Sequence, residues 1–97
     1  MAESTPGNAR PQFVDRIVSR EHRFSLGIEA RSGQPYVSIP VSNQLVDYEE
    51  FYAIDQGMFD RFMANAGEAL AFVERCRRRE EDARLFYQPS SRRGTPV

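Results

Sequence analysis

The spacing of apolar residues changes once along the chain, and this change constrains the fold more than any other feature. Between Arg23 and Val41, outside a short polar loop, apolar and polar residues alternate, as in β-strands with one buried face. From Met58 to Cys76, large apolar residues recur at the spacing of a helix that packs on a core. Strands followed by helices predict an α+β domain, in which the helices cover one face of a sheet.

The alternating half divides into three expected strands. Segments 24–30 and 36–41 flank a polar loop, 31–35, whose glycine can supply a positive φ, and this pattern predicts a β-hairpin. A third strand is expected at 45–54. The sequence thus predicts a three-stranded antiparallel β-meander packed on a C-terminal helical pair. Pro40 lacks the N–H group that a strand donates, so we expect the second strand to be open or bulged on one side there.

The third strand combines aromatic and carboxylate side chains, and its alternation is imperfect. One face carries Tyr48, Glu50 and Tyr52, whereas the other carries Phe51 among acidic residues. Either face can be the buried one. We expect the tyrosine face to point inward, because its large apolar groups outweigh the single carboxylate of Glu50.

The segments on either side of the strands give less uniform signals. In 11–21, Phe13 and Ile17 have helical spacing, which favours a short N-terminal helix or arm, although an irregular strand is the alternative. Asp55 precedes the helical half and is a suitable N-cap. A second helix is expected at about 66–82, with its buried stripe listed here: Ala69, Phe72, Val73 and Cys76.

The two ends are polar and are expected to be disordered tails, 1–10 and 88–97, so that 11–87 forms a single domain. A core of this size is marginal alone, and one Cys and one His cannot provide a disulfide or a His-based metal site. The apolar knot 85–87 also has no partner that the sequence identifies. We therefore expect the chain to form a homodimer.

The sequence offers no catalytic constellation, metal-ligand cluster or cofactor motif. Cys76 lies on an apolar helical stripe and is expected to act as a small buried hydrophobe. His22 stands alone, which favours a structural or surface role. With no apolar run long enough to span a bilayer and no secretory signal, we expect a cytoplasmic protein that does not contact membranes.

The third strand is the best candidate for a binding surface. Tyr48, Glu50, Phe51 and Tyr52 combine aromatic rings with a carboxylate, a composition suited to a cationic or amphipathic protein partner. The sequence therefore favours a non-catalytic protein-interaction or regulatory module. An enzyme or small-ligand site that uses a buried Glu50 in an aromatic pocket is the least favoured alternative.

All thirteen basic residues are arginine, which is typical of bacterial genomes rich in G and C. Arg77, Arg78 and Arg79 form the densest basic run and could contact phosphate or an acidic partner, including the acidic strand of a second copy. Nucleic-acid binding through this helix and the C-terminal tail is the main alternative function. Glu74 and Glu80 interleave with the run, however, and the spacing of Glu74 and Arg78 predicts an ion pair within the helix.

Overall fold

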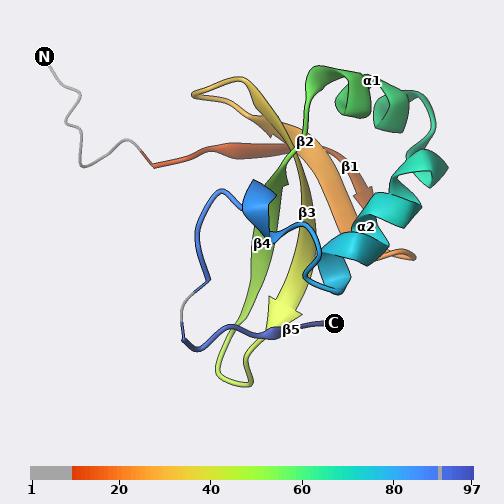
Figure 1. Ribbon diagram of the computed structural model, residues 1–97. Coiled ribbons are helices and arrows are strands. Elements are labelled where there is room, and N and C mark those ends of the chain that lie inside the picture. The colour runs from red at the N-terminus through yellow and green to blue at the C-terminus, as the bar shows by residue number, and fades with distance from the viewer. Residues whose placement is uncertain (1–9, 90) are drawn as a thin grey trace, which may run out of the picture.

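The computed structural model describes residues 10–89 and 91–97, which form an antiparallel sheet with helices on one face (Figure 1). The strands β1 to β4 follow one another as a meander, in the order β1-β2-β3-β4. Their bounds are β1 Phe13–Ser19, β2 Phe24–Glu29, β3 Gln34–Ser42 and β4 Asp47–Ala53. A short strand near the C-terminus, β5 (Thr95–Pro96), pairs with the end of β3.

The helices follow β4 in sequence and cross the sheet on the right of Figure 1. The elements are α1 (Gln56–Ala64), the 3₁₀ turn η2 (Ala66–Ala69), α2 (Leu70–Arg77) and the 3₁₀ turn η3 (Asp82–Arg84). The α+β class is therefore confirmed. The three-stranded meander is corrected, because the sheet has a further strand before the predicted hairpin and a short one at the C-terminus.

The additional strand is β1, so segment 11–21 contains the irregular strand that was our alternative and not the favoured helix or arm. The register between β1 and β2 shifts between Asp15 and Ile17, which marks a β-bulge. Because of this bulge, Phe13 pairs with Glu29 on one face of the sheet, whereas Ile17 packs on the core of the opposite face. The four-residue spacing that resembled a helix thus belongs to an irregular strand.

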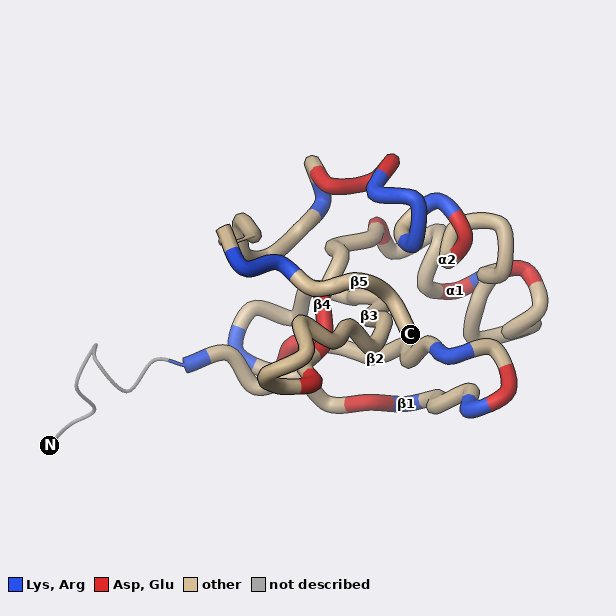
Figure 2. Tube along the Cα trace, turned by 90° about the horizontal axis from the view of Figure 1, so that it is seen from below, with Lys and Arg blue, Asp and Glu red and all other residues tan. Residues whose placement is uncertain are grey.

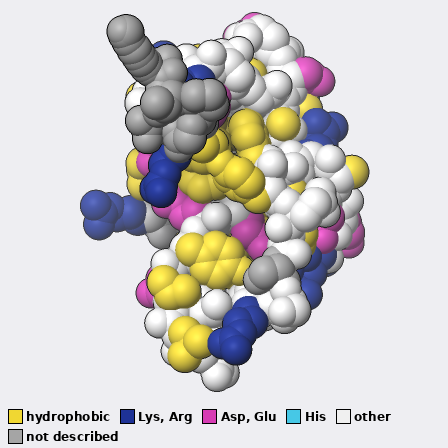
Figure 3. Space-filling model, turned by 90° about the vertical axis from the view of Figure 1, so that its left-hand side faces the viewer, with side chains coloured by type: hydrophobic (Ala, Val, Ile, Leu, Met, Phe, Trp, Pro, Cys, Tyr) yellow, Lys and Arg dark blue, Asp and Glu magenta, His cyan; other side chains and the backbone are white. Residues whose placement is uncertain are grey.

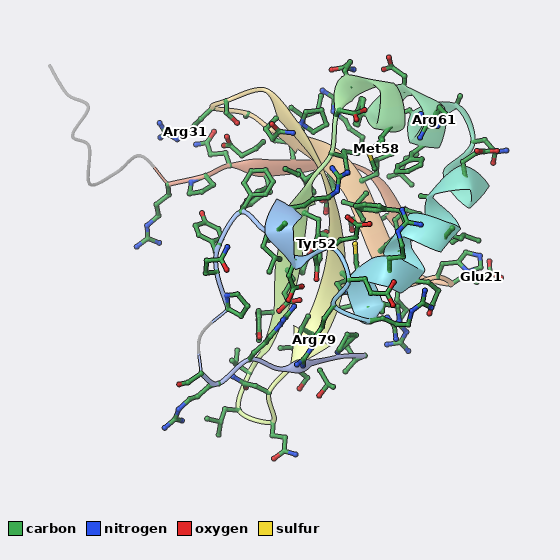
Figure 4. The ribbon with its side chains drawn as sticks, viewed as in Figure 1. Glu21, Arg31, Tyr52, Met58, Arg61 and Arg79 are labelled. Carbon is green, nitrogen blue, oxygen red and sulfur yellow. The ribbon has the colours of Figure 1, made fainter. Side chains whose placement is uncertain are left out.

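The main core lies between the sheet and the helices. Tyr52 of β4 is fully buried there and lies between its strand and α2 (Figure 4), so the tyrosine face of β4 is the inner one, as predicted. The stripe predicted for the second helix is buried as well. Its members are Ala69, Phe72, Val73 and Cys76.

Aromatic side chains also pack on the sheet face away from the helices. Phe13 stacks on Phe51 with 3.7 Å between ring centroids and meets the edges of Tyr36 and Phe86. Gly27 leaves room for this cluster, because a Cβ there would come within 2.6 Å of the Tyr36 hydroxyl oxygen. Phe86 belongs to the apolar knot 85–87, so this knot has an intramolecular partner that the sequence did not reveal.

The helical half begins as predicted and ends early. Asp55 Oδ1 accepts a hydrogen bond from the Met58 amide at 2.8 Å, which confirms the N-cap. The second helix, expected to reach about residue 82, stops at Arg77. Arg79 then adopts a φ of 63°, and the amide of Glu80 donates to the carbonyl of Arg75. This is a Schellman ending with arginine in the position that usually holds glycine.

Residues 91–97, which we expected to belong to a disordered tail, pack against the sheet in the structure. β5 lies beside β3 where β2 has ended, and the Val97 amide donates to the Pro40 carbonyl. On this side of β3, β5 therefore replaces β2 as the neighbouring strand around Pro40, where we expected an open or bulged side. Of the expected N-terminal tail 1–10, only Arg10 lies within the described residues.

Candidate functional site

A groove runs along the outer side of β4, between this strand and the segment after η3. Its volume is about 210 Å³. Consecutive residues 48–51 line it, so side chains from both faces of the sheet contribute and the groove follows the strand edge. Figure 3 faces this side and shows hydrophobic side chains in two groups with acidic side chains between them. The opposite wall consists of Leu85, Tyr87, Gln88, Pro89 and Arg92, with Asn43 at one end.

The backbone of β4 is open along part of this groove. In an antiparallel sheet, the N–H and C=O groups of alternate residues point to opposite sides of the strand. The Phe51 carbonyl accepts a hydrogen bond from the Phe86 amide, so Phe51 points away from β3, and Glu49 and Asp47 share its parity. Among the described residues, β4 pairs with β3 on its inner side and only with Leu85 on its outer side. Within residues 10–89 and 91–97, the outward-facing backbones of Asp47 and Glu49 therefore pair with no strand.

An ion-pair network holds Glu50, one of the residues that line the groove. Arg93 Nε lies 2.8 Å from Glu50 Oε2, and Arg93 Nη1 lies 2.7 Å from Asp82 Oδ2. The Tyr52 hydroxyl donates a further hydrogen bond to Glu50 Oε1 at 2.9 Å. Burial and these contacts to Glu50 raise the pKa of Tyr52 above its usual range, so the phenol stays protonated. The network joins β4 to η3 and to the C-terminal segment.

The charges in this network stabilise one another. The side chains of Arg93 and Glu50 are only 12% and 8% exposed. Hydrogen bonds from Arg93 lower the pKa of Asp82, while Asp82 and then Glu50 raise the pKa of Arg93. Both oxygens of Glu50 accept hydrogen bonds from Arg93. Glu50 is therefore buried, as the least favoured sequence hypothesis required, but it is an ion-paired structural carboxylate.

The structure brings together three of the four aromatic and acidic residues that the sequence singled out. Tyr48, Glu50 and Phe51 line the groove, whereas Tyr52 is a core residue that holds Glu50 from beneath. The Tyr48 hydroxyl accepts a hydrogen bond from the Gly94 amide at 2.7 Å.

Sequence reasoning missed the partner that holds Glu50 and the far wall of the groove. Arg93 stands 43 positions from Glu50 and lies in a polar segment, so no local pattern announces their pairing. Tyr87 is 55% exposed and forms part of the far wall. Its place in the apolar knot 85–87, which the sequence left without a partner, was the one available signal.

The arginine run lies apart from this lining, at the end of α2, where short runs of basic and acidic residues follow one another along the chain (Figure 2). Arg78 lies 3.5 Å from Glu74, which confirms the predicted helical pair, and 2.9 Å from Glu80. Arg77 and Arg79 donate hydrogen bonds to carbonyls of the C-terminal segment, at Val97 and Gly94. The run thus takes part in contacts within the chain.

The remaining sequence candidates stand alone. Cys76 is fully buried, and burial raises the pKa of its thiol well above the usual range. His22 lies in the turn between β1 and β2, 3.7 Å from Glu21. Within residues 10–89 and 91–97, no cluster of three or more His, Cys, Asp and Glu side chains has the arrangement of a metal site. None of the helices there has the length and apolarity needed to cross a membrane.

Comparisons of this chain with protein-family models, with curated proteins and with solved structures found no match.

Proposed function

We propose that this protein is a non-catalytic interaction module that binds an extended segment of a partner protein along the outer edge of β4. The observation that supports this proposal is the outer edge of β4 at Asp47 and Glu49, which pairs with no described strand and borders the groove. An unpaired strand edge offers hydrogen bonds to another strand, and an adjoining pocket can select the side chains of that strand.

The size of the groove favours a peptide over a small molecule. Small-molecule sites commonly have volumes of about 300–1,000 Å³. The groove has about 210 Å³, which is room for one large side chain between Tyr48, Phe51 and Tyr87. Main-chain pairing along the strand edge would supply the rest of the contact.

The charges favour a basic partner over a second copy of this chain. Asp47 and Glu49 are exposed, and the adjacent Glu50 is already paired with Arg93. If the β4 edges of two copies paired antiparallel, their carboxylates would face one another, which is destabilising. Lysine or arginine residues that flank an apolar anchor would complement this edge.

The homodimer stays a prediction, but it loses the support of the apolar knot 85–87, for which the sequence identified no partner. The knot 85–87 packs within its own chain, through Leu85 against Tyr52 and Phe86 against Phe13. The nucleic-acid alternative also stays a prediction, although Arg77, Arg78 and Arg79 take part in intramolecular contacts. An enzymatic role for Glu50 gains no support, because Arg93 and Tyr52 occupy its oxygens.

A displayed library of random peptides tests the proposal. We expect the protein to enrich peptides in which a large apolar residue stands among alternating basic residues. Glu49→Pro removes an outward-pointing N–H, which an edge strand tolerates, and should abolish binding of these peptides. Glu49→Gln is the matched control, since it removes the charge and keeps the N–H, and it should weaken binding only in part.

A second pair of variants guards against misfolding of the proline variant. Tyr87→Ala removes an exposed groove residue and should weaken binding, whereas Met63→Ala removes an exposed apolar residue on α1 and should not. Circular dichroism would verify that each variant is folded. Failure to enrich any peptide, or equal binding of the enriched peptides to wild type and folded Glu49→Pro, would overturn the proposal.

A further inference from the structure

A second hollow lies on the sheet face away from the helices, near the turn between β1 and β2. Its volume is about 420 Å³, which falls in the range of small-molecule sites. Ser25 and Ser38 line it and lie directly opposite each other in β2 and β3. Neighbouring positions on this face carry the rings of Tyr36 and Phe51. Because the two serine side chains are small and their neighbours are large, the sheet face is hollow at the serines.

The hydroxyl of Ser25 is an unused polar group in this hollow. Ser25 is only 9% exposed, and its side chain has no hydrogen-bond partner among the residues that the structure describes. Ser38 is 1% exposed and donates to Glu49 Oε1 at 2.8 Å. A buried hydroxyl without a partner is costly, and a group that occupies the hollow would satisfy it. Ser25 is thus available to donate to a ligand.

Two guanidinium groups contribute to the lining. Arg20 and Arg23 belong to the turn between β1 and β2, and neither has a carboxylate partner within the described parts of the chain. Glu21, the acidic residue between them, lies against His22. Arg23 also has a φ of 59°, an uncommon conformation for a residue other than glycine. Such conformations are often found at functional sites.

The rest of the lining differs in character. Val18 is 58% exposed and, with Pro40, gives the hollow an apolar surface. Glu49 contributes a carboxylate from β4. The hollow thus combines a basic turn, a buried hydroxyl, an apolar surface and a carboxylate that can accept a hydrogen bond. Convergent polar groups on an apolar cavity are the usual composition of a ligand site.

We propose that this hollow binds a small organic anion that has one acidic group, an apolar body and a hydrogen-bond donor. Arg20 and Arg23 bind the acidic group, which is a carboxylate or a phosphate monoester, because guanidinium matches both. The Ser25 hydroxyl donates to an acceptor of the ligand. Glu49 accepts from its donor and disfavours ligands with a second acid, since like charges repel. This site is independent of the proposed peptide groove, except that Glu49 lines both.

The test is a titration of the ¹⁵N-labelled full chain, followed by amide chemical shifts. The probes are α-amino acids with apolar side chains, phosphate monoesters of amino alcohols, dicarboxylates and inorganic phosphate. We expect one of the first two groups to shift the amides of Val18, Ser25 and Ser38, with a dissociation constant on the order of millimolar. Comparison of these two groups identifies the acidic group.

Variants decide whether the binding uses the proposed contacts. Arg23→Gln should weaken binding about tenfold or more, since it removes a charge-assisted contact. Ser25→Ala should weaken it without loss of stability. The control is Arg61→Gln, which changes an exposed arginine on α1 and should leave binding unchanged. Arg20 and Arg23 are exposed, so their variants should fold.

Three results would overturn the proposal. The first is the absence of shifts at these amides for every probe at concentrations well above the expected constant. The second is binding of inorganic phosphate and dicarboxylates as tight as that of the first two groups of probes. This result would show that the site binds any anion and requires neither an apolar body nor a hydrogen-bond donor. The third is binding that Arg23→Gln and Ser25→Ala leave unchanged.

Discussion

Replacement of Arg93 by glutamine should be among the most destabilising single changes that leave the apolar core intact. Arg93 bonds both oxygens of Glu50, at 2.8 and 3.0 Å, and both oxygens of Asp82, at 2.7 and 2.9 Å. Two unit charges about 4 Å apart attract by about 4 kcal/mol at an effective dielectric constant of about 20. Removal of one member of a buried pair costs about 3–5 kcal/mol, because the other charge stays desolvated.

The expected loss lies at the lower end of that range. Asp82 is 35% exposed and regains water easily, so the cost comes mainly from Glu50, which is 8% exposed. Release of the C-terminal segment would also let water reach Glu50. We therefore expect Arg93→Gln to lower the free energy of unfolding by about 3 kcal/mol. For a domain of this size, that corresponds to a fall in Tm of about 12–24 °C.

The assay is urea unfolding followed by circular dichroism, with Arg78→Gln as the control. Arg78 also contacts two carboxylates, Glu74 and Glu80, but its side chain is 55% exposed, so its loss should have little effect. A double-mutant cycle with Glu50→Gln should give a coupling energy of about 1–3 kcal/mol. Equal stabilities for the Arg93 and Arg78 variants would refute the assignment of Arg93 as the residue that holds the C-terminal segment on the sheet.

Three further predictions concern the fold. Gly94→Ala should destabilise the protein by about 1–3 kcal/mol in urea unfolding, because a Cβ there would lie 2.5 Å from the Ser42 backbone, whereas Gly57→Ala should not destabilise it. Hydrogen bonds from the Gln12 amide, Ser32 and further amides lower the pKa of Glu29 to about 2. The stability that these bonds contribute above about pH 4.5 should therefore be lost as the pH falls towards 2. In Glu29→Gln, the free energy of unfolding should depend less on pH over this interval. Cys76 should react with a thiol reagent only as fast as the protein unfolds, and rapid labelling of folded protein would contradict its burial.

The local features of the fold could be predicted from the sequence because each depends on neighbouring residues. Asp55 caps α1 through an amide three residues away. The buried stripe of the second helix, which includes Phe72, follows from the helical spacing of its apolar residues alone. The hairpin of β2 and β3 follows from alternation around a loop in which Gly33 has a φ of 76°. β1 was only the alternative prediction for 11–21, because the bulge after Asp15 leaves Phe13 and Ile17 at the spacing of a helix.

The features that were not predicted depend on a residue in an unusual conformation or on contacts between distant residues. Arg79 takes a conformation that usually requires glycine, so the end of α2 carried no recognisable signal. The path of residues 91–97 depends on Arg93 reaching Glu50, and on a Gly94 carbonyl that accepts from Arg79. For the groove, composition identified Tyr48, Glu50 and Phe51 as candidates. The far wall of the groove lies opposite these residues and could not be inferred, because it depends on the path of the chain after η3.

Amide hydrogen exchange at Glu49 tests the proposed peptide-binding edge most directly. In the free protein, the amide of Glu49 should exchange much faster than those of Tyr48 and Glu50, which face β3. Addition of an enriched basic peptide should slow exchange at Glu49 and leave its two neighbours protected as before. An amide of Glu49 that is protected without any peptide, or that exchanges equally fast with saturating peptide bound, would contradict pairing at this edge.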